Sequence, residues 1–145
     1  DFHIEDAAGS LVPVLQSGAD AVLAFTFHKR TERPVQGLDV GFSIHDNSGN
    51  QNYAVLYSSY QNVAFEVTGS RGCVRCRIPA LPLAAGRYRI GARLTIRGTE
   101  ADWPRDGVGW IDVVEGDFYG SGRKGFGGQA PILLKGDWSL EERGT

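Results

Sequence analysis

Polar and aromatic side chains recur at alternate positions in three segments of the chain, residues 36–46, 87–97 and 110–115. Planar polar groups exchange hydrogen bonds with hydroxyls, and a flat aromatic ring offers an apolar surface for the C–H face of a sugar. If the segments are neighbouring strands, their outward side chains form one surface. The candidate carbohydrate-binding residues are Asp39, Ser43 and His45 in the first segment, Arg87, Arg89 and Arg93 in the second, and Trp110 and Asp112 in the third.

Two glycines add to this pattern. Gly41 and Gly91 stand among these residues and carry no side chain, so they predict a depression in the middle of the surface, where a sugar ring would fit. The set predicts non-covalent binding of a glycan, with no catalytic residue, no cofactor and no metal ligand.

Other roles are open for each of these residues. A register shift of one residue would turn Trp110 into the core, because side chains alternate between the two faces of a strand. If they bind no ligand, the arginines would protect a sheet face and pair with Asp39 and Asp112. His45 would then be an ordinary surface residue beside a turn. Taken together, a one-sided cluster of Arg, His, Asp and Trp favours binding.

The sequence offers little for catalysis or metal binding. It contains no Gly-x-Ser-x-Gly motif of a serine nucleophile. Asp39 and Asp112 would act as a glycosidase pair only if a cleft held them a few ångströms apart. Cys73 and Cys76 are three positions apart in a predicted strand, so they point to opposite faces and do not favour a disulfide or a shared metal. One core cysteine and one surface cysteine are expected.

The elements that position these residues are predicted to be β-strands. In residues 86–96 the apolar Tyr88, Ile90 and Leu94 alternate with polar residues, which is typical of a strand with one face on a core. Similar strands are predicted at residues 2–7, 21–28, 36–46, 53–58, 61–67, 73–78 and 110–115. The fold class is therefore all-β, an antiparallel β-sandwich of immunoglobulin-like or jelly-roll type. Such an order places the three polar segments in one sheet.

The connecting segments carry further aromatic residues. Residues 98–107 are predicted as a polar loop in which Trp103 is an anchor. Tyr53 and Tyr57 are predicted to share one face of their strand and to belong to the core.

The character of the chain changes after Glu115. Residues 116–128 hold six glycines, and residues 131–135 (PILLK) predict a terminal strand. That strand cannot bury itself, so it completes the sandwich or is exchanged in a dimer. The predicted organisation is one domain, with residues 1–116 as the sandwich core and residues 117–145 as the Gly-rich segment and C-terminal strand.

Composition limits the remaining functions. The 145 residues suit one domain, and the net charge of −2 argues against nucleic acid as a partner. No apolar run approaches the roughly 20 residues of a membrane helix. The chain begins at Asp1 and contains no methionine, which indicates a piece of a longer protein.

A longer pattern runs through the second half of the chain. Its parts are Ile78-Pro79, Leu81, Leu83, Gly86 and Tyr88, then WIDV at residues 110–113, GDFYGSGRKG from residue 116 and PILLKGDW at residues 131–138. The pattern resembles the C-terminal domain of the Wzt type, which is fused to the nucleotide-binding subunit of ABC transporters that export O-antigen polysaccharide. DFYGSG followed by ILLKGDW is its most specific part.

The resemblance implies a β-sandwich that binds an O-antigen-like polysaccharide and has no catalytic residues. It implies a homodimer, with the transporter permease and the ATPase domain of the parent protein as partners, in the cytoplasm at the inner face of the inner membrane. This chain has no G-x-x-x-x-G-K-[ST] loop, so ATP hydrolysis is not assigned to it. Two alternatives stay open: a structural dimerisation module without a glycan site, and an enzyme that acts on a glycan.

Overall fold

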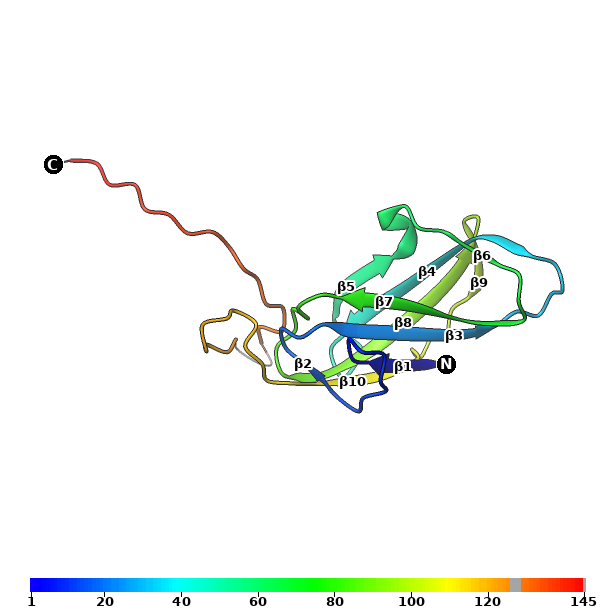
Figure 1. The fold of residues 1–145 in the computed structure, drawn as a ribbon, viewed down its shortest axis with the longest axis horizontal. Helices are drawn as coiled ribbons and strands as arrows, with labels where there is room; N and C mark the ends of the chain where they lie inside the picture. Colours follow the sequence, from blue (N-terminus) through cyan, green and yellow to red (C-terminus); the bar gives the residue numbers. More distant parts are fainter. Residues whose placement is uncertain (126–128, 145) are drawn as a thin grey trace.

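Two β-sheets pack face to face (Figure 1). The computed structural model describes residues 1–125 and 129–144 of the chain. The small sheet has the strand order β1-β3-β7, and both of its strand pairs are antiparallel. Its strands are β1 (Phe2–Glu5), β3 (Ala21–His28) and β7 (Arg71–Ile78).

The large sheet holds all three polar segments. Its order is β2-β10-β8-β4-β5, so β4, β8 and β10 are neighbours and the prediction of a shared sheet is confirmed. The path consists of β2 (Leu15–Gln16), β10 (Gly109–Val114), β8 (Gly86–Ile96), β4 (Val35–His45) and β5 (Asn52–Tyr57). β6 (Phe65–Val67) also pairs with β4, β9 (Thr99–Asp102) pairs with β8, and the 3₁₀-helix η1 (Ser58–Gln61) follows β5. The β2–β10 pair is parallel, whereas the other strand pairs are antiparallel.

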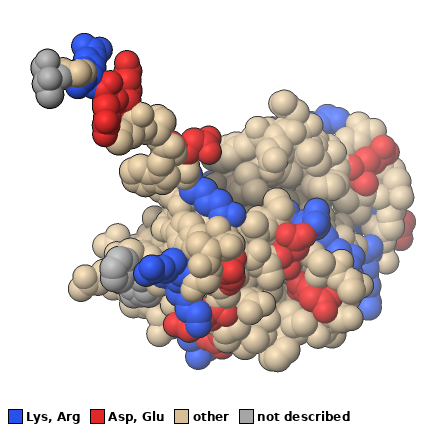
Figure 2. All heavy atoms as spheres, turned by 60° about the vertical axis from the view of Figure 1, so that its left-hand side comes forward, with Lys and Arg blue, Asp and Glu red and all other residues tan. Residues whose placement is uncertain are grey.

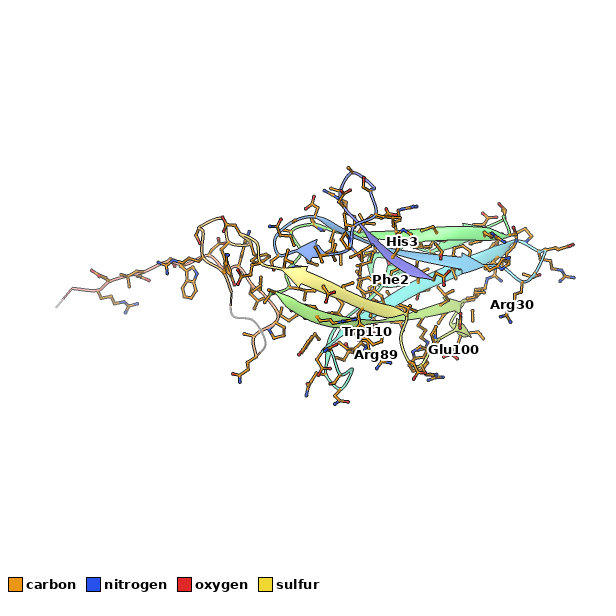
Figure 3. All side chains as sticks on the ribbon, turned by 90° about the horizontal axis from the view of Figure 1, so that it is seen from below. Phe2, His3, Arg30, Arg89, Glu100 and Trp110 are labelled. Atoms are coloured by element: carbon orange, nitrogen blue, oxygen red, sulfur yellow. The ribbon has the colours of Figure 1, made fainter. Side chains whose placement is uncertain are left out.

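The core lies between the two sheets, and β8 contributes to it as its alternation predicts. Tyr88 and Ile90 are buried, whereas Arg87 is exposed. The Tyr88 hydroxyl donates to the Ala84 carbonyl at 2.6 Å, and burial raises the pKa of Tyr88 to about 12. On the side away from the small sheet, Arg89 and Trp110 project from the large sheet (Figure 3). The all-β sandwich is therefore confirmed, with the polar residues of its large sheet facing outward.

The chain after β8 differs from the predicted polar loop over residues 98–107. Thr99–Asp102 form β9, which pairs with the end of β8 in a hairpin. The turn residues Arg97 and Gly98 have φ values of 51° and 82°, the left-handed conformation that a two-residue hairpin turn requires. The hairpin brings Trp103 back beside the middle of β8.

β5 also differs from the sequence prediction. Tyr57 pairs with Gly41 on the outer face, but the register shifts between Ile44 and His45. Because this bulge adds one residue to β5, Tyr53 lies on the opposite face and packs against the core, with its ring 6.2 Å from that of Tyr88. The prediction that Tyr53 and Tyr57 share a face is wrong.

The predicted terminal strand at residues 131–135 is reduced to one isolated bridge, between Leu83 and Ile132. The Leu133 amide donates to the Pro82 carbonyl at 2.8 Å, and its side chain is buried with Ala84 and Phe118. The segment therefore docks on its own sandwich, and the chain then extends away from the sheets (Figure 1). Residues 126–128 of the Gly-rich segment lie outside the described residues, and the division of the domain at residue 116 stays a prediction.

Charges of both signs are interspersed over the face of the molecule in Figure 2.

The Glu5 carboxylate on the small sheet is a buried charge, because its side chain is only 5% exposed. Arg75 Nε donates to Glu5 Oε1 at 2.9 Å, and His3 Nε2 lies 2.6 Å from Glu5 Oε2. The hydrogen bond from Arg75, followed by that from His3, lowers the pKa of Glu5 despite the opposing effect of burial.

Replacing Glu5 by glutamine is expected to weaken the acid dependence of stability. A carboxyl whose folded pKa is depressed stabilises the fold above its unfolded pKa, here 4.5, and loses that contribution as the pH falls through the lower folded value. Urea unfolding at a series of pH values from neutral downward measures this. The free energy of unfolding of Glu5→Gln should be lower at neutral pH and should decline less below pH 4.5. Parallel curves for the two proteins would contradict the prediction.

Candidate ligand-binding cleft

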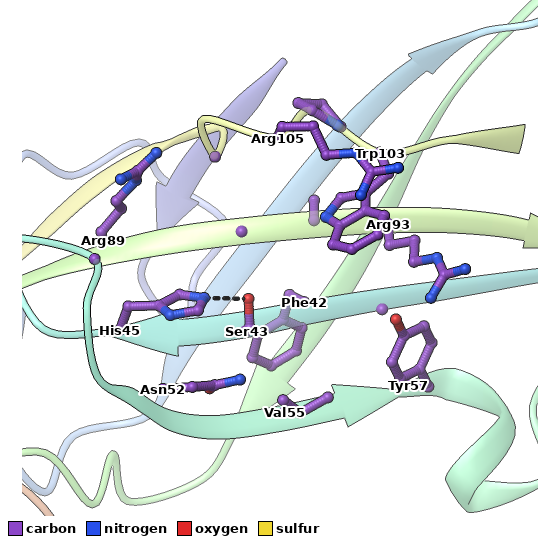
Figure 4. A pocket seen from close by; sticks show the side chains of 16 residues that line it. Phe42, Ser43, His45, Asn52, Val55, Tyr57, Arg89, Arg93, Trp103 and Arg105 are labelled. Atoms are coloured by element: carbon purple, nitrogen blue, oxygen red, sulfur yellow. Dashed lines mark hydrogen bonds between the residues drawn. The ribbon is translucent and has the colours of Figure 1, made fainter. Parts of the chain in front are cut away.

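A cleft of about 260 Å³ opens on the outer face of the large sheet (Figure 4). β4 and β8 form its floor, β5 and the turn after β4 form one side, and residues 103–107 form the other. The polar and aromatic side chains that line this cleft are those of Ser43, His45, Asn52, Tyr57, Arg89, Arg93, Trp103 and Arg105, together with the largely buried Phe42.

The floor carries a hydrogen-bonded pair. The alternation of β4 places Ser43 and His45 on the outer face, where Ser43 Oγ and His45 Nε2 are 2.7 Å apart (Figure 4). The register of β4 with β8 places Arg89 directly across from His45. The floor therefore offers a hydroxyl, an imidazole and a guanidinium to a ligand.

Tyr57 forms one aromatic side of the cleft. A Cβ atom at Gly41 would collide with the Tyr57 ring, so this glycine lets the ring lie close against the backbone of β4. Similarly, a Cβ atom at Gly91 would lie 2.5 Å from Ser43 Oγ. Both glycines line the cleft, and the room that they leave is used by Tyr57 and Ser43.

Trp103 forms the opposite aromatic side. The guanidinium carbon of Arg105 lies 3.5 Å from the centre of the Trp103 ring, and that of Arg93 lies 4.9 Å from it. Both distances suit a cation–π interaction, which holds a cation over the face of an indole. Glu100 balances part of the charge, at 3.5 Å from Arg93 and 3.8 Å from Arg105.

Arg89 joins the two sides of the cleft. Its Nη2 donates to the Asp106 carbonyl in the wall of residues 103–107. A Cβ atom at Gly49, in the turn on the other side, would be only 2.6 Å from Arg89 Nη1. Gly49 and Gly107 both have φ of 81°, a left-handed conformation that glycine adopts without strain. The Arg89 side chain therefore lies between the two glycine-containing turns.

Both sheets fall within residues 1–117, and the model of the family described as "Wzt C-terminal domain" matches these residues. The chain belongs to the Wzt C-terminal domain family. A crystal structure of the C-terminal domain of wzt is similar with a TM-score of 0.71 and 17% identity, and the match covers 97% of this chain and 81% of that chain. Family membership confirms the resemblance in the sequence and associates this domain with an ABC transporter system and a polysaccharide.

Other solved structures resemble this Wzt C-terminal domain less. β-Glucuronidase 2 of Bacteroides uniformis, covalently bound to cyclophellitol-6-carboxylate aziridine, is 13% identical with a TM-score of 0.46. That match covers 71% of this chain and 12% of the glucuronidase, and it is too weak to bear on function. No curated protein sequence matches the chain.

In this Wzt C-terminal domain, half of the predicted binding residues line the cleft. They are Ser43, His45, Arg89 and Arg93. The others, which are Asp39, Arg87, Trp110 and Asp112, do not line it. The strands that carry the predicted residues therefore share one sheet, but the cleft covers only the part of its outer face over β4, β5 and the middle of β8.

Asp39 is held by η1 instead of facing the cleft. Its Oδ1 accepts from Ser58 Oγ at 3.1 Å and from the Ser59 amide at 2.9 Å, and its Oδ2 accepts from Ser59 Oγ at 2.6 Å. Burial raises the pKa of Asp39, but these hydrogen bonds together outweigh burial and leave the pKa lowered. The contacts give Asp39 a structural role at the start of the 3₁₀-helix.

Trp110 faces solvent, which decides between the two registers that the sequence left open. It is 49% exposed, and it lies across from Arg89, whose other neighbour is His45. The Arg87 guanidinium carbon is 5.5 Å from the centre of the Trp110 ring, and Arg87 also approaches Asp112 at 3.9 Å. These three residues form an exposed aromatic and polar patch on β8 and β10, beside the cleft.

Sequence reasoning missed four of the polar and aromatic side chains that stand around the cleft. They are Asn52, Tyr57, Trp103 and Arg105. A partial signal was available for Trp103 and Arg105, because Gly98 favours the positive φ of a two-residue hairpin turn, whereas Arg97 does not. No local signal pointed to Tyr57, because β5 carries apolar residues on both faces and the pairing of Tyr57 with Gly41 decides its face.

The cysteines take ordinary places in β7. Cys76 packs against the core, where burial raises the pKa of its thiol, and Cys73 is half-buried. Within residues 1–125 and 129–144, no three His, Cys, Asp or Glu side chains are grouped as metal ligands. The same described residues contain no helix long and apolar enough to cross a membrane.

Proposed function

We propose that this Wzt C-terminal domain binds an O-antigen-type polysaccharide non-catalytically and acts as the substrate-recognition domain of an ABC glycan exporter. The observation that supports this most is the cleft, in which Tyr57 and Trp103 stand on opposite sides of a floor formed by Ser43, His45 and Arg89. Aromatic faces suit the C–H surfaces of a sugar ring, and the floor suits its hydroxyls. Its volume of about 260 Å³ suits a short part of a glycan.

The exposed patch of Arg87, Trp110 and Asp112 is proposed to extend this site. Arg89 lies between the cleft and Trp110, so a chain leaving the cleft would cross onto the Trp110 ring. Asp39 is left out of the proposed site because η1 uses both of its carboxylate oxygens.

Binding at a single site is expected to be weak, because hydroxyl-rich contacts exchange hydrogen bonds with water for little net gain. We propose a homodimer whose two sites face one polysaccharide, which raises the effective affinity through local concentration. The proposed partners are the permease and the ATPase domain of the parent protein, in the cytoplasm at the inner face of the inner membrane.

The alternative is a structural dimerisation module with no glycan site. It is favoured by the apolar side chains after the docked Leu133, since Leu134, Trp138 and Leu140 are 77%, 97% and 81% exposed. Such surface is typical of an interaction segment. The family's association with a polysaccharide favours the glycan-binding proposal over this one.

An NMR titration of the labelled domain with a panel of oligosaccharides tests the proposal. Glycan binding predicts shifts at the amides of Ser43, His45 and Arg89, and at the indole of Trp103. No shift on this face with any glycan, together with an intact dimer in sedimentation, would support the dimerisation module. A cleaved or modified glycan after incubation would contradict the non-catalytic role.

Gly41→Ala is expected to lower glycan affinity about tenfold, because the new methyl group pushes the Tyr57 ring away from β4. Calorimetric titration of the two proteins with one glycan measures the change. Gly136→Ala is the matched control, since a Cβ there meets no atom within 4 Å. Equal affinities of Gly41→Ala and the parent would show that the position of Tyr57 does not matter for binding.

A further inference from the structure

We infer that the cleft recognises an anionic group carried on a sugar, a carboxylate or a phosphate. This inference rests on the proposed function, because it assigns a ligand class to the same cleft. Arg89, Arg93 and Arg105 bring three guanidiniums to the cleft, whereas its described lining residues include no aspartate or glutamate.

This positive charge is local to the cleft. The whole chain carries a net charge of −2, so general basicity does not explain three arginines around one small hollow. The three come from separate places in the fold, two from β8 and one from the loop after β9. A local cationic cleft in an acidic domain attracts anions more than neutral molecules.

The protein neutralises these arginines incompletely. Glu100 is the carboxylate near both Arg93 and Arg105, and its distances of 3.5 and 3.8 Å are longer than those of a charge-assisted hydrogen bond. Arg89 has a backbone carbonyl as its hydrogen-bond acceptor. Arg93 and Arg105 therefore share one carboxylate, and Arg89 forms no ion pair within the described residues, which leaves positive charge for a ligand to balance.

Arg93 carries the most direct sign of a missing partner. Its Nε is buried, and it donates to no acceptor among the described residues. Leaving a buried donor unpaired is costly, and the penalty is larger for a charged group. The Arg93 side chain as a whole is 37% exposed, and a guanidinium presents a planar fork of donors that matches a carboxylate or a phosphate. A small shift of this side chain toward an anionic ligand would pair the buried donor as well.

The aromatic sides indicate that the anion is attached to a sugar. A free anion would use the guanidiniums alone, but Tyr57 and Trp103 also expose apolar ring surface to the cleft (Figure 4). A sugar acid or a sugar phosphate can satisfy both kinds of surface at once. A neutral sugar would displace water from the arginines without balancing their charge.

NMR titration of the full domain with four probes tests the inference. The probes are glucose, glucuronic acid, glucose 1-phosphate and inorganic phosphate, followed at the Arg Nε–H and Trp indole resonances. We expect at least one of the acidic sugars to bind about tenfold more tightly than glucose, and we expect added sodium chloride to weaken its binding. Comparison of the two acidic sugars distinguishes a carboxylate ligand from a phosphate ligand.

Three variants and one control assign the effect to the arginines. Arg93→Gln and Arg105→Gln should each weaken acidic-sugar binding about tenfold, and each should weaken acidic-sugar binding more than glucose binding. Arg93→Lys keeps the charge but loses the fork, so it should restore part of the affinity. Arg71→Gln on β7 makes the same charge change on the small sheet and should leave binding unaltered. Thermal unfolding of each variant shows whether it is folded.

The outcomes separate this inference from the proposed function. Equal affinity for glucose and both acidic sugars would overturn the inference and leave glycan binding in place. Binding of inorganic phosphate as tight as that of the acidic sugars would support an anion site but contradict sugar recognition. Binding of none of the four probes would overturn the inference, while the oligosaccharide titration described above tests the proposed function independently.

Discussion

Trp103→Ala should weaken glycan binding more than any other single change in this domain. The Trp103 ring forms one side of the cleft and also lies beside the guanidiniums of Arg93 and Arg105. Its removal deletes an apolar surface for a sugar and frees two arginines from their present positions. Loss of an aromatic residue at the centre of a binding site costs about 2 kcal/mol or more, which is about thirtyfold in affinity.

Calorimetric titration with an oligosaccharide that binds the parent protein measures this effect. Trp138→Ala provides a matched control, because Trp138 is 97% exposed in the C-terminal extension and lies outside the cleft. The control should retain the affinity of the parent protein. If Trp138→Ala weakened binding and Trp103→Ala did not, the glycan site would lie on the C-terminal extension and the proposed cleft would be wrong.

Ile90→Ala should cause the largest loss of stability. Ile90 is fully buried in β8, directly beneath the polar face, and it belongs to the core between the two sheets. Removing three carbons from such a site leaves a cavity that the sheets cannot close, at a cost of about 3 kcal/mol in the free energy of unfolding. Because β8 also carries Arg89 and Arg93, the cleft should be lost together with the fold when Ile90→Ala unfolds.

Urea unfolding followed by tryptophan fluorescence measures this loss. Val114→Ala is the matched control, since Val114 is 44% exposed on β10, and a change there should alter stability by less than about 0.5 kcal/mol. A loss below about 1 kcal/mol for Ile90→Ala would mean that the core relaxes around the missing side chain. Together the two variants separate the contribution of burial from that of residue type.

The candidate surface was predictable where side-chain direction follows from local alternation. Ser43, His45, Arg89 and Arg93 occupy outward positions of two well-patterned strands, and all four line the cleft. The pairing of their strands was also predictable from the immunoglobulin-like order. The role of each residue was not predictable. Asp39 illustrates this, because its carboxylate accepts hydrogen bonds from η1, which comes from a different part of the chain.

The sequence alone predicted the β-sandwich and the shared sheet of its three polar strands, because a period of two and the turn residues between strands are local properties of the chain. The motifs of its second half carried the resemblance to the family. Only the tertiary structure decided which side chains surround the hollow. Tyr57 reaches it through the pairing of β5 with β4, and Trp103 and Arg105 reach it through the β8–β9 hairpin. The bulge in β5 turns Tyr53 to the core while Tyr57 stays on the outer face, and the position of a bulge depends on the partner strand as well as on the residues nearby. The cleft is therefore a product of strand pairing over long distances in the chain.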